Sequence, residues 1–121
     1  MGKRVQSYRD LVAWKKAVEL VTDIYRLTQG FPKEEMFGLI SQLRRAAVSI
    51  PSNIAEGHAR TSRKEFQHFL SNARGSVAEL ETQLIISYNL AFINQTDLNR
   101  LLDQVAEVGR IINGLLTALK K

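Results

Sequence analysis

The residues of this sequence most suited to chemistry are its two histidines and the carboxylates near them. Glu65 and His68 have the Glu-x-x-His spacing that di-iron helix bundles use, but such a site needs two of these motifs and two further inward-facing glutamates. Only one motif occurs. His58 has Glu56 two residues away, on a different face of any helix. We therefore expect no metal ligands.

Covalent catalysis is not favoured either. The chain has no cysteine, which excludes a thiol nucleophile, a disulfide framework and a thiolate zinc site. Neither histidine lies in a recognisable nucleophile elbow or triad context, and no phosphate-binding glycine loop occurs. Glu79 and Glu81 are two residues apart, which turns them to different faces of a helix, and we expect ion pairs instead. Arg74 could pair with Glu81 along the same helix, or Arg44 or Arg45 could reach the glutamates from the second helix. We predict a protein that is not an enzyme and uses no cofactor.

Basic residues are the more informative group. The chain carries 17 Lys and Arg against 12 Asp and Glu, a net charge of +5. They gather near the N-terminus and around residues 60–64, a distribution typical of polyanion binding. No helix-turn-helix, zinc finger or aromatic RNA platform is visible, so we predict phosphate contacts to RNA or DNA rather than base reading. The candidate residues are Arg9, Lys15, Lys16, Arg60, Arg63 and Lys64.

A second function stays open, because a net charge of +5 is also consistent with an ordinary solvated surface that binds no nucleic acid. The alternative is a scaffold or adaptor that binds a protein partner through exposed apolar helix surface, with no direct nucleic-acid role.

Four amphipathic helices must position these residues. Apolar residues recur at three- and four-residue intervals and no segment alternates strictly, so the fold class is all-α. The expected helices run from an Asp10 cap to about residue 28, from about 33 to 57, from a Ser62–Glu65 capping box to about 88, and from a Thr96 cap to the C-terminus. Pro51 should kink the second helix.

Short turns between such helices favour an antiparallel up-down-up-down four-helix bundle. One domain covers residues 1–121, with residues 1–8 as a flexible basic arm. The stretch from Leu80 to Thr96 is too short and polar to span a membrane, and no apolar signal core follows the N-terminus. We expect a cytoplasmic protein that does not enter membranes.

Two surfaces suggest self-association. On the first helix we assign Leu11, Trp14, Val18, Val21 and Tyr25 to the core, and Ala17, Leu20, Ile24 and Leu27 widen the apolar area beyond one face. On the third helix, Ser71, Gly75, Ala78 and Thr82 form a stripe of small residues opposite the core. Small side chains permit another helix backbone to pack closely, and this has no use on a face that contacts only water. We therefore expect an oligomer.

Several segments match a known protein family. The longest is QLRRAAVSIPSNIAEG at residues 42–57, preceded by FPKEE at 31–35 and GL at 38–39. YRDL with Trp14 lies upstream, and ARGS and ELETQ lie downstream at 73–76 and 79–83. From Tyr8 onward the chain resembles the bacterial four-helix bundle proteins encoded within intervening sequences of 23S ribosomal RNA genes.

The resemblance implies a homopentamer with a central channel. It also implies similarity to the accessory proteins of diversity-generating retroelements, basic pentameric bundles that bind nucleic acid and a reverse transcriptase. A reverse transcriptase is thus one possible protein partner. The family has no established catalytic residues to carry over. We expect its polar positions to form a buried network that braces the helices: Arg44, Arg45, Asn53, Glu56, Ser76, Glu79 and Glu81.

Overall fold

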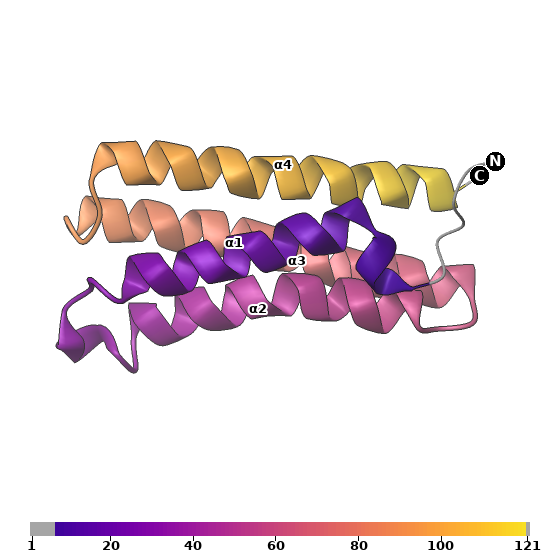
Figure 1. Cartoon of the computed structure of the whole chain (residues 1–121), viewed down its shortest axis with the longest axis horizontal. Coiled ribbons are helices and arrows are strands. Elements are labelled where there is room, and N and C mark those ends of the chain that lie inside the picture. Colours follow the sequence, from indigo (N-terminus) through magenta and orange to yellow (C-terminus); the bar gives the residue numbers. More distant parts are fainter. Residues whose placement is uncertain (1–6, 121) are drawn as a thin grey trace.

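The computed structural model describes residues 7–120, so most of the basic arm predicted at residues 1–8 lies outside the described residues. Four long helices lie side by side and successive helices run in opposite directions (Figure 1). The first packs against both the second and the fourth, which closes the bundle. The predicted all-α up-down bundle is confirmed. Its helices are α1 (Val12–Thr28), α2 (Leu39–His58), α3 (Arg63–Asn89) and α4 (Gln95–Leu119), with short 3-10 turns η1 (Tyr8–Asp10) and η2 (Lys33–Glu35).

The core-facing side of α1 differs from the predicted one. Ala17, Leu20 and Ile24 are fully buried, whereas Val18 and Tyr25 are 37% and 40% exposed. Apolar residues cover more than half of this helix, so their periodicity does not say which stripe faces inward. Ala17, Leu20 and Ile24, which were predicted to widen the apolar surface, therefore fill the core. Leu11, Trp14 and Val21 of the predicted face are half-buried and pack against that core.

The other three helices bury most of the apolar residues whose spacing predicted their inward faces, although Met36 before α2 and Tyr88 on α3 are 47% and 37% exposed. On α2 these residues are Ile40, Leu43, Ala47, Ile50 and Ile54. On α3 and α4 the same holds for Leu70, Ala73, Val77, Leu80, Leu84, Leu98, Leu101, Val105, Val108 and Ile112. All belong to one continuous hydrophobic core.

Two predicted N-caps are wrong. Asp10 lies in η1, and the N-cap of α1 is Leu11, which makes no side-chain capping bond. At α4, Asn94 caps the helix in place of Thr96, and its Oδ1 accepts a hydrogen bond from the Asp97 amide at 2.7 Å. Asn ranks above Thr as an N-cap residue, so residue type already favoured Asn94 over the predicted Thr96.

Side-chain acceptors mark the other two helix starts, a carboxylate at α2 and a hydroxyl at α3. α2 begins at Leu39 rather than near Lys33, and the Glu35 carboxylate accepts the Leu39 amide at 3.1 Å. At α3 the predicted cap is confirmed, because the Ser62 hydroxyl accepts the Glu65 amide at 3.1 Å.

Pro51 lies inside α2, which continues through it from Leu39 to His58. The proline is buried, and Asn53 donates from Nδ2 to the Ser49 carbonyl at 2.8 Å beside it. The expected kink stays a prediction. Among residues 7–120 no helix is long and apolar enough to cross a membrane.

Candidate nucleic-acid interface

The basic residues predicted to bind phosphate lie at one end of the bundle. Arg9 is in η1, and Lys15 and Lys16 lie near the start of α1. Arg60 lies in the α2–α3 turn, and residues 63–64 open α3. Figure 1 shows that the start of α1, the α2–α3 turn and the end of α4 share this end, which we call the basic end. Two clusters that are far apart in sequence thus lie at the same end of the bundle.

Arg60 is held in place by its neighbours. Its guanidinium pairs with Glu56 at 3.2 Å and with Glu65 at 3.7 Å, and it lies over the Phe69 ring at 5.0 Å. Because two carboxylates offset its charge, Arg60 offers less free positive potential than the sequence suggested. Its contacts also tie the end of α2 to the start of α3.

A shallow groove of about 420 Å³ lies beside this arginine. Lys64 and His68 line it from α3, together with the Phe69 ring. His58 and His68 each meet an aromatic ring edge-on, Phe66 at 5.8 Å and Phe69 at 5.4 Å. Within residues 7–120 no three His, Cys, Asp or Glu side chains gather closely enough to hold a metal ion.

On α1 the two adjacent lysines differ in their surroundings. Lys16 forms a 3.2 Å ion pair with Glu107, which links α1 to α4. Lys15 is exposed and makes no ion pair with any described residue, and the same is true of Lys64 on α3. No carboxylate within residues 7–120 therefore offsets the charge of Lys15 or Lys64.

Arg9 is placed by aromatic packing. Its guanidinium lies 5.8 Å from the Tyr8 ring centre, and that ring meets Trp14 edge-on at 5.3 Å. Ser7 caps the turn by accepting the Arg9 amide at 3.2 Å. Residues 7 and 8, which we assigned to the flexible arm, are thus part of the folded η1 segment.

Two further basic residues join this end, and sequence reasoning did not include them. Arg74 and Lys120 line one small groove of about 220 Å³ between α3 and α4. Arg74 donates to the Asn113 Oδ1 at 3.5 Å and makes no ion pair with Glu81, although we expected one. The sequence contained part of this information, because it placed Arg74 on the same predicted helix as Lys64. The pairing of α3 with the end of α4 needed the tertiary structure.

The expected bracing network forms only in part. Ser76 shares a 2.8 Å hydrogen bond with Ser49, and Asn53 donates to the same Ser49 hydroxyl at 3.0 Å. Arg44 donates from Nε to the Thr28 hydroxyl at 2.9 Å and lies 4.5 Å from the centre of the Tyr25 ring.

The remaining members of that expected network do not join it. Glu56 is exposed and pairs with Arg60. Arg45 and Glu79 are exposed, and no described residue forms an ion pair with either or with the half-buried Glu81. The prediction was wrong for these positions, because a match to a family pattern does not reveal which side of a helix is buried.

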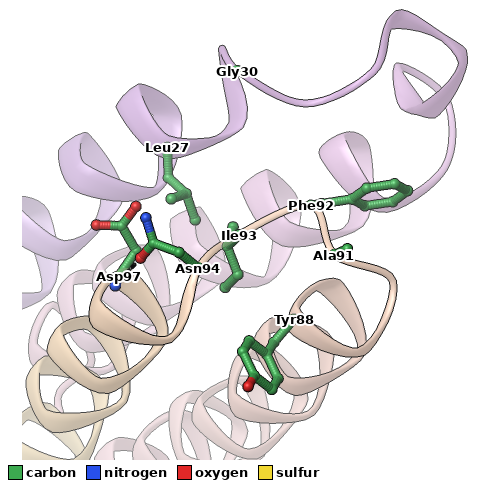
Figure 2. Close-up of a pocket in the computed structure, with 8 residues that line it drawn as sticks. All are labelled: Leu27, Gly30, Tyr88, Ala91, Phe92, Ile93, Asn94 and Asp97. Carbon is green, nitrogen blue, oxygen red and sulfur yellow. Dashed lines mark hydrogen bonds between the residues drawn. The ribbon is translucent and has the colours of Figure 1, made fainter.

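A larger pocket of about 560 Å³ lies at the opposite end of the bundle (Figure 2). Leu27 and Ile93 supply its apolar wall, and Asn94 and Asp97 lie beside each other at its edge. Asn94 is already engaged as the α4 cap. The residues lining the pocket include a carboxylate and no cation, so it does not suit a phosphate group.

Comparison with known proteins agrees with this architecture. A solved structure from Bacteroides thetaiotaomicron, described as a protein with unknown function from the S23 ribosomal protein family, is 22% identical to this chain. The match covers 88% of this chain and 96% of that one with a TM-score of 0.82, which confirms the fold. A search among curated proteins finds no match. The family model for the 23S rRNA-intervening sequence protein matches residues 9–114. The chain therefore belongs to the 23S rRNA-intervening sequence protein family.

Proposed function

We propose that this protein is a non-enzymatic oligomer that binds RNA or DNA through phosphate contacts from its basic end. The observation that carries the proposal is the convergence of η1, the start of α1 and the α2–α3 turn at one end of the bundle. Lysine and arginine side chains gathered on one surface attract a polyanion more strongly than the same charges spread evenly. Lys15 and Lys64 contribute most, because no carboxylate in the described part of the chain pairs with them.

Assembly strengthens the proposal. One chain carries a net charge of +5, and five copies, the number implied by family resemblance, would carry about +25. Each copy repeats the same weak phosphate contacts, and linked weak contacts bind far more tightly than a single one. A modest charge on a small chain then becomes sufficient for nucleic-acid binding.

The test is a salt titration of RNA and DNA affinity. The variant reverses three charges at the basic end: Arg60→Glu, Arg63→Glu and Lys64→Glu. Its matched control reverses three charges at the opposite end, so that both proteins have the same net charge: Arg26→Glu, Lys33→Glu and Arg100→Glu. We expect the first variant to lose at least tenfold more affinity than the control, with a shallower dependence on salt. Circular dichroism checks that both retain their helices.

Equal losses in the two variants would mean that net charge alone acts, and the basic end would not be a site. Wild-type affinity that stays constant as salt rises would contradict binding through phosphates altogether.

The scaffold function has its own supporting observation. Met36 and Phe37, between η2 and α2, are 47% and 97% exposed. Exposed apolar side chains of this size are common anchors for protein partners, of which a reverse transcriptase is one candidate. Phe37→Ala should abolish capture of such a partner and leave the affinity for RNA unchanged. The reverse pattern would favour nucleic-acid binding as the primary role.

A further inference from the structure

The shallow groove of about 420 Å³ at the basic end contains two rings that phosphate binding does not require. Arg60, Lys64, Glu65, His68 and Phe69 line it, and we call it the α3 groove. Its volume lies within the range of protein sites that hold small organic groups. A phosphate needs only cations and N–H donors, so the rings provide for a second kind of contact.

The two rings of the groove form a corner. The centres of the His68 and Phe69 rings are 5.4 Å apart and their planes differ by 75°, so the rings do not stack on each other. Arg60 lies over the Phe69 ring at 5.0 Å, and Phe69 is half-buried. His68 is exposed. The imidazole of His68 is therefore the ring that offers a flat surface to a ligand, with Phe69 as the adjacent wall.

The charges of the groove favour an anionic ligand. Arg60 and Lys64 are its cations, and Glu65 is the one carboxylate among the residues that line it. Glu65 accepts a hydrogen bond from the Ser62 hydroxyl at 3.1 Å and pairs with Arg60 at 3.7 Å, so its charge is engaged within the protein. Lys64 makes no ion pair with a described residue. A ligand that suits both the imidazole and Lys64 carries a flat aromatic group beside a negative charge, as a nucleotide does.

We propose that an unpaired base of single-stranded RNA or DNA lies in the α3 groove, stacked on the His68 imidazole with its edge toward Phe69, while Lys64 binds an adjacent phosphate. Lys64 and His68 are four residues apart on α3 and therefore lie on the same face. A duplex does not offer such a base, because its bases are already paired and stacked.

This inference rests on the proposed function and names its substrate class, single-stranded nucleic acid. Stacking accepts every base, because each has an aromatic face, so it adds affinity without sequence reading. It therefore agrees with a site that binds the backbone through phosphates.

The experiment compares two single strands that carry the same number of phosphates. One is an oligothymidylate, and the other is the same strand with abasic residues at alternate positions. The wild-type protein should bind the complete strand at least about fivefold more tightly, the lower end of what stacking of one base provides.

Four variants locate the contact. His68→Ala should remove most of this preference and leave the affinity for the abasic strand unchanged, whereas His68→Phe, which restores an aromatic ring, should retain the preference. Lys64→Gln should weaken the binding of both strands equally. Phe37→Ala is the matched control, because this ring is 97% exposed at the opposite end of α2, and it should leave the preference unchanged.

Equal affinities of the wild type for the two strands would overturn this inference, and the proposed function would survive if both affinities fall with added salt. A preference that persists in His68→Ala would place the bases elsewhere on the protein and overturn it as well. Loss of the preference in both His68→Ala and His68→Phe would contradict stacking as the contact. A wild type that binds neither strand would remove the proposed function and this inference together.

Discussion

Ser49 on α2 and Ser76 on α3 share a hydrogen bond of 2.8 Å between two helices that pack closely along their lengths. The Ser76 side chain is 8% exposed, so water does not readily replace a lost partner. Ser76→Ala should lower the free energy of unfolding by about 1 kcal/mol, since Ser49 keeps its bond from Asn53. Urea unfolding measures the change. Ser71→Ala, at an exposed position of the same helix, is the control and should shift stability by less than about 0.5 kcal/mol.

Gly57, in the last turn of α2, permits a close approach to α3. A Cβ at this position would lie 2.7 Å from the Phe69 Cβ and 2.9 Å from the Phe66 Cδ1. Gly57→Ala should therefore destabilise the bundle by about 1–3 kcal/mol, although alanine favours helices. Gly114 is exposed in α4, and a Cβ added there would meet no atom within 4 Å, so alanine should instead stabilise by roughly 0.5–1 kcal/mol. Thermal unfolding of both variants distinguishes the two environments, and equal signs would contradict the close approach.

Asn94 rather than Thr96 is the N-cap of α4, so substitutions at the two positions should change stability by different amounts. Asn94→Ala removes the acceptor for the Asp97 amide and should cost about 1 kcal/mol. Thr96→Ala lies inside the first turn of the helix, makes no cap and should change stability by a few tenths of a kcal/mol. Chemical denaturation of the two variants tests this order. A larger loss at Thr96 would mean that the helix starts where the sequence pattern alone had suggested.

Substitutions at Lys15 and Lys64 should lower nucleic-acid affinity without changing stability. Neither makes an ion pair with a described residue, so Lys15→Gln with Lys64→Gln should leave thermal unfolding unchanged. If both contact phosphates, the slope of log affinity against log salt for single-stranded RNA should fall by about 1.4. Lys16→Gln is the comparison, because it breaks the Glu107 ion pair and should cost up to about 1 kcal/mol of stability. Unchanged RNA affinity in the double variant would remove both lysines from the interface.

Local pattern was enough to predict the helices, their number and most of their buried faces. On α2, α3 and α4 a period of 3.6 residues identified an inward side, as the buried Leu43, Leu80 and Val105 show. Ser62 was also predictable as a cap, because capping involves only residues within one turn of each other. These features depend on residues that are close together in the sequence, so the sequence alone is enough to predict them.

The tertiary structure decided what depends on contacts between distant segments. The inward side of α1 is the one that packs against α2 and α4. Ala17 and Leu20 lie on that side and are fully buried. Lys15 and Lys64 lie at the same end of the molecule only because the chain folds back on itself in the bundle. The positive charge of Arg60 is largely offset there by ion pairs with Glu56 and Glu65. Periodicity describes one helix at a time, whereas a shared surface exists only after the helices have packed together.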